Sequence, residues 1–212
     1  MTSPYRAALG GIIDALHPRL RAYFDEIPPG HVGRGSGVFD VVGARNPLLW
    51  PFLELLEREG VAVARFGRRI RFEVENRPGH GASVHARRTM HFTGLDWVMV
   101  DAIAAVPGAS ARGHRMLVDD LGTTRRIRAA FSATTDRGAL LLTSTRIGVR
   151  LGRARLTIPR PCAPVVTLEE RFDDDRDAQH VDVRIRVPLL GTVYRYAGWF
   201  TYRVELEGTH EL

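Results

Sequence analysis

Hydrophobic and polar residues alternate with a period of two along most of the chain after residue 60. The clearest example is the segment 181–204, in which two alternating stretches flank a Pro-Leu-Leu-Gly turn at 188–191. Successive side chains of a strand point to opposite faces of a sheet, so this pattern predicts an antiparallel hairpin with one buried face. One face is aliphatic and tyrosine-rich and the other carries arginines, which indicates an apolar inner surface that also has hydroxyl groups.

Apolar residues repeat at helical spacing before residue 60, in the segments 5–27 and 47–59. Asn46 suits the N-cap of the second segment, Pro47 suits its first position, and Gly60 ends it. The glycine-rich stretch 30–43 lies between the two segments and predicts only a short strand, at 38–42.

These patterns predict an α+β fold, with two or three N-terminal helices and a large curved antiparallel sheet of about eight or nine strands. Strands of about ten residues are long enough to wrap into a barrel or half-barrel, although the pattern leaves open whether the sheet closes. A chain of 212 residues can bury one substantial core. We therefore expect a single domain over 1–212, with helices in 1–60 and antiparallel sheet in 61–207.

The formal net charge is +6, and all 30 basic residues are arginine. The arginines are scattered through nearly every segment and are interrupted by acidic residues, whereas a nucleic-acid footprint clusters on one face. We therefore expect no nucleic-acid partner. The single cysteine, Cys162, excludes a disulfide-stapled scaffold. No apolar run approaches the roughly 20 residues of a membrane span, so we expect a cytoplasmic protein without a membrane span.

The surrounding sequence does not support three common kinds of functional site: a phosphate-binding loop, a metal site and a reactive cysteine. The glycine cluster at 33–37 has no strand before it and no Lys-Ser/Thr after it, so it does not fit a phosphate-binding loop. The closest approach to a metal site is His80, His85 and His91, but the last two share a strand face that also carries arginine and threonine. Cys162 has no neighbour in sequence that would activate a thiolate. We expect neither a metal nor a cofactor.

Two charged residues occupy positions that the alternation assigns to an apolar face. Arg88 lies between Ala86 and Met90, and Glu170 lies between Leu168 and Phe172. An isolated buried charge costs several kcal/mol, so these side chains should be paired, hydrated or held for a ligand. A structural ion pair, or a bulge that turns them outward, is the simpler interpretation. The functional interpretation is a polar anchor in an apolar pocket.

Aromatic residues supply the other candidate ligand contacts. Tyr194 and Tyr196 share the apolar face of the last strand, where their hydroxyl groups need partners. Trp50 in the second helical segment and Trp97 in an apolar stretch could pack in the core or line a cavity. Arg146, which follows Leu142 and Ser144 in an alternating stretch, is a weaker member of the inward charged set.

Short segments along the chain carry a family resemblance: Leu-His-Pro-Arg-Leu at 16–20, Val-Gly-Arg-Gly-Ser-Gly-Val-Phe at 32–39, Arg-Ile-Arg-Phe at 69–72, Ile-Pro-Arg-Pro at 158–161 with Ala-Pro at 163–164, Arg-Val-Pro-Leu-Leu-Gly at 186–191 and Tyr-Ala-Gly-Trp at 196–199. Over residues 16–206 the chain resembles a bacterial family of uncharacterised domains, found alone or attached behind a dinucleotide-binding domain of the epimerase or saccharopine-dehydrogenase type. The resemblance implies no catalytic set. Because this chain lacks a dinucleotide-binding domain, the resemblance does not imply a direct redox role.

Three functions follow as hypotheses. The first is binding of a hydrophobic small molecule in a sheet-lined cavity, with Arg88 and Glu170 as polar anchors and Tyr194 and Tyr196 as hydroxyl donors. The second is a cofactor-independent enzyme of the cyclase or isomerase kind, in which Glu170 acts as general acid or base and Arg88 steadies an oxyanion. The third is an accessory partner of a separate dinucleotide-dependent oxidoreductase. The sequence leaves open whether the protein binds a protein partner or forms a homo-oligomer.

Overall fold

The computed structural model describes residues 2–108, 115–159, 161 and 163–208, so Cys162 lies outside the described part of the chain. Three short α-helices precede most of the sheet: α1 (Pro4–Leu9), α2 (Pro18–Phe24) and α3 (Trp50–Arg58), with 3₁₀ turns η1 (Gly10–Ala15) and η2 (Pro47–Leu49) leading into α2 and α3. In the part that the structure describes, no helix is long and apolar enough to cross a membrane.

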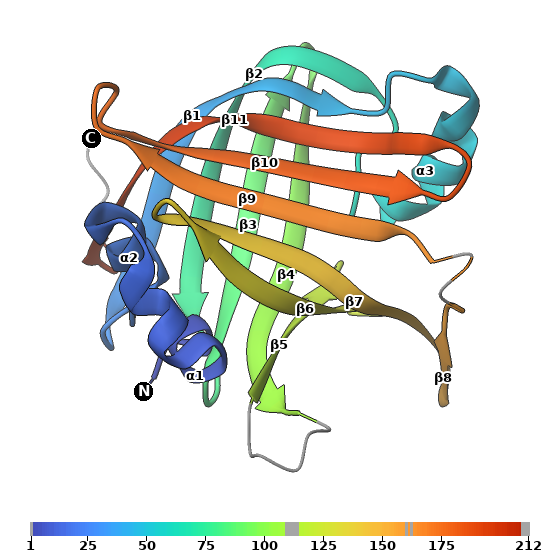
Figure 1. The fold of residues 1–212 in the computed structure, drawn as a ribbon. Helices are drawn as coiled ribbons and strands as arrows, with labels where there is room; N and C mark the ends of the chain where they lie inside the picture. The colour runs from blue at the N-terminus through green and yellow to red at the C-terminus, as the bar shows by residue number, and fades with distance from the viewer. Residues whose placement is uncertain (1, 109–114, 160, 162, 209–212) are drawn as a thin grey trace.

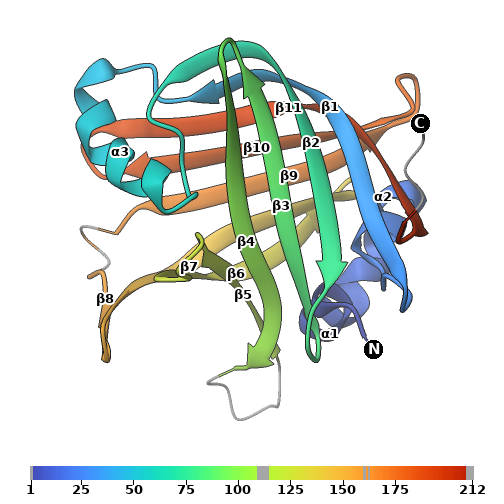
Figure 2. The same cartoon turned by 180° about the vertical axis from the view of Figure 1, so that it is seen from behind.

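The strands form one antiparallel sheet that closes on itself (Figures 1 and 2). They are β1 (His31–Gly43), β2 (Phe66–Pro78), β3 (Ser83–Phe92), β4 (Leu95–Pro107), β5 (Arg115–Leu121), β6 (Ile127–Asp136), β7 (Ala139–Leu151), β8 (Ala154–Thr157), β9 (Val165–Asp173), β10 (Ala178–Val187) and β11 (Gly191–Leu206). The order is β6-β5-β4-β3-β2-β1-β11-β10-β9-β7, and β7 also pairs with β6. Strand β8 pairs with β7 beyond the ring. The predicted α+β barrel class is confirmed, with more strands than expected.

The β1–β11 ladder explains the glycine-rich stretch. Gly37 pairs with Phe200 and Gly198 pairs with Phe39, and the register shifts just after Phe39. A Cβ atom on Gly37 would lie 2.0 Å from the Trp199 carbonyl oxygen, and one on Gly198 would lie 2.1 Å from the Val38 carbonyl oxygen. Glycine is therefore required because the backbones of the two strands approach too closely for a side chain.

The predicted boundary, with helices in 1–60 and sheet in 61–207, is wrong. The sheet does not begin at residue 61, since β1 is a 13-residue strand at His31–Gly43 that pairs on both sides, with β2 and β11. The start of the second helical segment is confirmed. The Asn46 side chain accepts a hydrogen bond from the Leu48 N–H (3.0 Å), and the chain continues from η2 into α3 with Pro51 in the first turn.

The barrel has two different ends (Figure 1). At the N-terminal end, apolar residues of the segment 3–27 pack against inward-facing leucines of β5 and β7, namely Leu117, Leu140 and Leu142. At the other end, here called the α3 end, the segment after α3 crosses the barrel mouth. It is tied there by hydrogen bonds from the Val100 N–H to the Gly60 carbonyl (3.1 Å) and from the Thr123 N–H to the Glu59 carbonyl (2.8 Å). Both ends of the barrel are thus covered, one by the segment 3–27 and the other by the segment that follows α3.

Replacing Gly37 with alanine should destabilise the protein, because the added methyl group meets backbone atoms that cannot move away. We expect a loss of about 2–3 kcal/mol in the free energy of unfolding, typical of overpacking. Gly11 is the matched control, since a Cβ atom there would have no neighbour within 4 Å and its φ is not positive. Urea denaturation of both variants checks this, and equal stabilities would contradict the close approach of β1 and β11.

Candidate functional site

A cavity of about 100 Å³ lies inside the barrel. Most of its lining is apolar and comes from inward-facing positions of several strands, for example Met99, Leu117, Phe131, Leu168 and Val183. Its polar lining consists of one arginine, three carboxylic acids and three tyrosines: Arg88, Asp101, Asp119, Glu170, Tyr5, Tyr194 and Tyr196. A small set of polar groups in an apolar chamber is typical of sites that orient a small ligand.

Strand alternation explains why these charges point inward. Arg88 on β3 lies between the buried residues Ala86 and Met90. Its partner in the β3–β4 ladder is Met99, and Asp101, two residues further along β4, points to the same side. Asp119 on β5 follows the buried Leu117 at the same spacing. Each acid therefore reaches the interior because it occupies an inward position of its strand.

Arg88 and Asp101 form a buried ion pair. The Arg88 guanidinium donates a hydrogen bond to Oδ1 of Asp101, and the two side chains are 17% and 2% exposed. Burial lowers the pKa of the Arg88 guanidinium, but the neighbouring Asp101 carboxylate raises that pKa well above its ordinary value. Arg88 thus stays charged, and one acid of the cavity is neutralised by the chain itself.

Glu170 on β9 does not pair with Arg88. Its carboxyl group accepts a hydrogen bond from the Gln179 side-chain amide on β10, and the residue is buried. Burial raises the pKa of Glu170 to about 7, against the opposing effects of Arg88 and the Gln179 hydrogen bond. A carboxyl group of this kind exchanges its proton near neutral pH, as a general acid or base must.

Two oxygen atoms of the cluster lack partners. Among the described residues, Asp101 Oδ2 and Asp119 Oδ1 are shielded from solvent and make no hydrogen bond. Burial raises the pKa of Asp119 well above its ordinary value, and repulsion from Asp101 adds to the effect. Buried polar atoms are normally hydrogen-bonded, so these two oxygens mark where a donor from outside the chain would be stabilised.

The tyrosines differ in how their hydroxyl groups are used. The Tyr194 hydroxyl accepts a hydrogen bond from the Val63 N–H (3.1 Å), which holds the segment after α3 across the barrel mouth. Tyr196 lies edge-on to Phe39, and burial raises its pKa well above its ordinary value. Tyr5 reaches the cavity from α1. In the described part of the chain the Tyr196 hydroxyl group makes no hydrogen bond, so it is better suited to a ligand than the Tyr194 hydroxyl group.

Four of the six site residues predicted from the sequence line the cavity, namely Arg88, Glu170, Tyr194 and Tyr196. The two tryptophans do not. Trp50 donates to the Ala44 carbonyl (3.0 Å) and Trp97 donates to the Glu57 carbonyl (3.4 Å), so both attach the α3 region to the barrel. Both tryptophans pack in the core between the α3 region and the barrel, and neither belongs to the lining of this cavity.

Arg146 is turned outward by a bulge. Ala130 pairs with Arg146 and Phe131 pairs with Ser144, which leaves Thr145 as the extra residue on β7. A one-residue shift moves the following side chains to the other face of a sheet. Arg146 is consequently exposed, and its predicted membership of the inward charged set is wrong.

The sequence interpretation missed Asp101 and Asp119. Asp101 lies in the apolar stretch 95–106, where long runs of hydrophobic residues obscure the alternation, although its spacing from Trp97 gives the inward face. Asp119 alternates with Leu117 and Leu121, and this alternation indicates that Asp119 faces inward with the two leucines. No group of three or more His, Cys, Asp or Glu side chains that could hold a metal ion occurs among the described residues.

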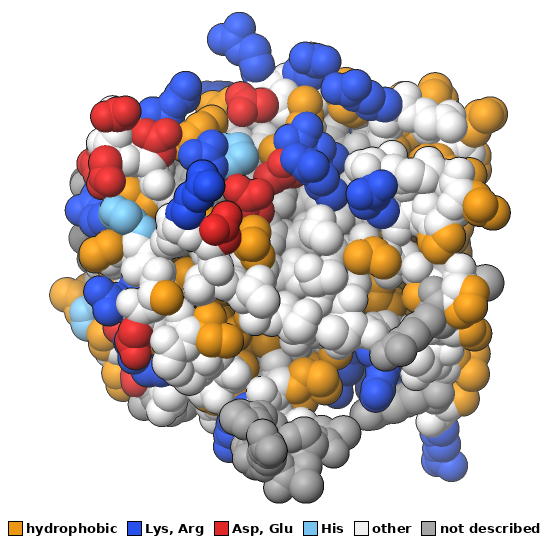
Figure 3. All heavy atoms as spheres, viewed as in Figure 1, with side chains coloured by type: hydrophobic (Ala, Val, Ile, Leu, Met, Phe, Trp, Pro, Cys, Tyr) orange, Lys and Arg blue, Asp and Glu red, His pale blue; other side chains and the backbone are white. Residues whose placement is uncertain are grey.

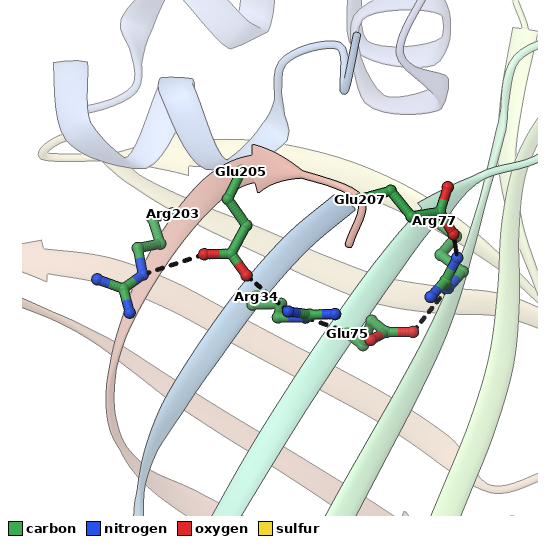
Figure 4. Close-up of polar contacts among 6 residues, drawn as sticks. All are labelled: Arg34, Glu75, Arg77, Arg203, Glu205 and Glu207. Carbon is green, nitrogen blue, oxygen red and sulfur yellow. Dashed lines mark hydrogen bonds and ion pairs between the residues drawn. The ribbon is translucent and has the colours of Figure 1, made fainter. Parts of the chain in front are cut away.

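The outer wall carries a different kind of polar network. A groove of about 460 Å³ runs over the outside of β1, β2, β3 and β11. Figure 4 shows six charged side chains of this wall paired in a continuous ladder, in the order Arg203, Glu205, Arg34, Glu75, Arg77 and Glu207. Because each charge already has an opposite neighbour, this ladder joins strands and does not offer free charge to a ligand.

Comparisons with known proteins give a family and a relative. A family described as "Domain of unknown function (DUF4166)" matches residues 16–200. The chain is also similar to the uncharacterised protein YndH of Bacillus subtilis (strain 168), with 24% identity over 191 residues, which cover 87% of this chain and 90% of that protein. The residues matched by the family run from just before α2 to β11 and include the four charged residues of the cavity, Arg88, Asp101, Asp119 and Glu170.

Replacing Arg88 with methionine should strongly destabilise the protein, because it leaves Asp101 buried without its counter-charge. We expect a loss of about 3–5 kcal/mol in the free energy of unfolding, and partial recovery when Asp101→Leu is added. Arg19→Met is the matched control, since Arg19 pairs with Asp177 at 2.9 Å on the surface and should change stability by less than about 1 kcal/mol. Urea denaturation of the three variants and the unmodified protein measures these values, and equal losses in the two single arginine variants would refute the buried pair.

Glu170 should make stability depend on pH. Its pKa is about 7 in the folded protein against an ordinary 4.5, so the folded state binds the proton more tightly than the unfolded state. The stabilisation is complete below pH 4.5 and is lost as pH rises through 7, by about 3 kcal/mol in total. Glu170→Gln has no carboxyl group to titrate at this position. As the pH rises from 4.5 to above 7, the stability of this variant should therefore increase relative to that of the unmodified protein. Denaturation curves at several pH values test this, and a difference that does not vary with pH would contradict it.

Proposed function

This chain belongs to the DUF4166 family of domains of unknown function, and from the interior of its barrel we propose that it binds a small, largely apolar molecule carrying a hydrogen-bond-donating group such as an amine. The observation that carries this proposal is the pair of unpartnered oxygens, Asp101 Oδ2 and Asp119 Oδ1, beside an apolar cavity. An unsatisfied buried polar atom costs about 1–3 kcal/mol. A ligand that donates hydrogen bonds to both atoms removes this cost.

The charges of the cavity favour a donor over an acceptor. The guanidinium of Arg88 is occupied by Asp101, so a carboxylate or phosphate ligand would have to displace a buried partner. Asp119 and Glu170 both have raised pKa values, so each binds a proton readily when the cavity holds no ligand. A protonated amine supplies the missing positive charge and allows either acid to ionise.

The volume of the cavity limits the ligand. A cavity of about 150 Å³ in another, engineered protein accommodates benzene, so the 100 Å³ found here suits a group no larger than one ring. Tyr5 on α1 forms part of the lining. A longer molecule would therefore need α1 and the rest of the N-terminal segment to move outward.

Catalysis in the same cavity is a second candidate function, favoured by the pKa of about 7 at Glu170. A cofactor-independent isomerase or cyclase requires a group that gives and takes a proton near neutral pH, and Glu170 faces the apolar chamber with Arg88 nearby. Glu170→Gln distinguishes the two functions once a ligand is known. Binding with loss of turnover supports catalysis, whereas a ligand that is never converted supports binding alone.

Three probes of similar shape test the proposal: benzylamine, benzyl alcohol and toluene. Benzylamine should bind most tightly, because only its ammonium group can neutralise the acids of the cavity. We expect an affinity about ten-fold above that of toluene, which corresponds to about 1.4 kcal/mol. Chemical-shift perturbation of the cavity-lining residues in NMR titrations measures the three affinities.

Two substitutions on β5 provide the control. Asp119→Asn should remove the preference for benzylamine, whereas Asp120→Asn should not, because Asp120 points outward and pairs with Arg128 at 2.6 Å. Native mass spectrometry of the freshly purified protein should also reveal a bound molecule. The proposal fails if no probe shifts the cavity residues at millimolar concentration and the protein carries no co-purified molecule.

A further inference from the structure

The most exposed large hydrophobic side chains gather at the α3 end of the barrel. Leu48 in η2 and Phe52 and Leu55 in α3 are 86%, 67% and 64% exposed. Leu190 in the β10–β11 turn is 65% exposed, and Leu189 beside it is fully exposed. Both parts lie at the same end, because Gly43, which precedes the α3 region, pairs with Arg195 near the start of β11. These five residues are called the apolar tip.

The α3 region is apolar on two sides. Leu53 is buried against the barrel, and Trp50 and Leu56 pack beside it. Leu48, Phe52 and Leu55 follow one another at i, i+4 and i+7, which places them on one stripe of the helix that faces solvent. The apolar arc of α3 is therefore wider than the side that packs against the barrel, and Glu54 and Arg58 occupy the remaining side. The outer stripe of α3 therefore has the character of a contact surface.

Positive charge surrounds the apolar tip. Arg45, Arg58, Arg68 and Arg186 are exposed, and within the described residues none of them forms an ion pair. By contrast, the arginines of the outer ladder in Figure 4 all have acidic partners. Figure 3 shows hydrophobic side chains along the right-hand edge, where α3 and the β10–β11 turn lie in Figure 1, and acidic side chains on the opposite half of that face.

Acidic residues near the tip cancel only part of this charge. Glu57 approaches Arg65 (3.9 Å), and Glu59 approaches Arg126 (3.8 Å), so each of these carboxylates has its own arginine. Glu54 is exposed on α3 one turn before Arg58. The tip therefore combines protruding leucines and a phenylalanine with arginines that have no acidic partner.

We propose that the apolar tip docks on the surface of an anionic lipid bilayer. The apolar side chains enter the boundary between head groups and acyl chains, while the arginines contact lipid phosphates. A second copy of this chain is a poorer occupant, because a twofold interface sets the same patch against itself and would bring these arginines together. This proposal does not depend on the ligand of the cavity. Docking would also place the barrel mouth crossed by the segment 59–63 against the membrane.

Sedimentation with vesicles tests the proposal. The unmodified protein should bind vesicles of phosphatidylcholine with about 30% phosphatidylglycerol, and bind vesicles of phosphatidylcholine alone about ten-fold more weakly, because the arginines need anionic lipid. Raising the salt concentration should weaken the first interaction. The double variants Phe52→Ser/Leu55→Ser and Leu189→Ser/Leu190→Ser should each reduce binding to the anionic vesicles by about ten-fold or more.

The matched control is Val204→Ser/Leu206→Ser, which removes two exposed apolar side chains (38% and 60% exposed) at the opposite end of the barrel and should bind as the unmodified protein does. Circular dichroism verifies that every variant is folded. The proposal is overturned if the unmodified protein does not bind anionic vesicles, or if the control loses binding as much as the tip variants do. A dimer in solution that the tip substitutions dissociate, without vesicle binding, would assign the tip to a second copy.

Discussion

Inside the barrel one guanidinium faces three carboxyl groups, and this imbalance governs the rest of the interior. Arg88 is committed to Asp101, so Asp119 and Glu170 have no cation of their own. In a region of low dielectric constant the two remaining acids must hold protons or receive charge from elsewhere, which is why burial raises the pKa of both. The apolar walls strengthen every one of these electrostatic effects. A barrel built only for stability would gain by replacing the cluster with hydrophobic residues.

Local patterning was sufficient for the fold class and for part of the site. Alternation with a period of two is a property of neighbouring residues, so it placed Arg88 and Glu170 on inward faces, where the structure has them. The ion-pair partner of Arg88 could not be predicted from alternation. Asp101 is 13 residues away, and its pairing depends on the register between β3 and β4, which the sequence pattern does not contain. Arg146 shows the same limit, because the bulge that turns it outward is defined by pairing with β6.

The glycine-rich stretch was misinterpreted for a related reason. Glycine is unfavourable in strands, so the glycines at alternate positions from Gly33 to Gly37 do not indicate a strand when the segment is considered alone, and only a short strand at 38–42 was predicted. Their purpose appears only beside β11, where Gly37 and Gly198 allow two backbones to approach closely at the bend of the sheet. Both glycines belong to segments that carried the family resemblance. The glycines of these two segments thus maintain the curvature of the barrel, whereas the charged residues of the cavity lie on other strands, namely Arg88, Asp101, Asp119 and Glu170.

Helix α3 lies between the two places for which we propose a binding partner, the cavity inside the barrel and the apolar tip. Its inner side, through Leu53 and the segment that follows, covers one mouth of the barrel, and the Tyr194 hydroxyl holds Val63 in that cover. Its outer side presents Phe52 and Leu55 to solvent. With only nine residues, α3 is too short to be stable by itself and depends on its packing against the barrel. A contact that drew its outer stripe away from the barrel would therefore also loosen the cover, and this one helix would then link occupancy of the apolar tip to access to the cavity.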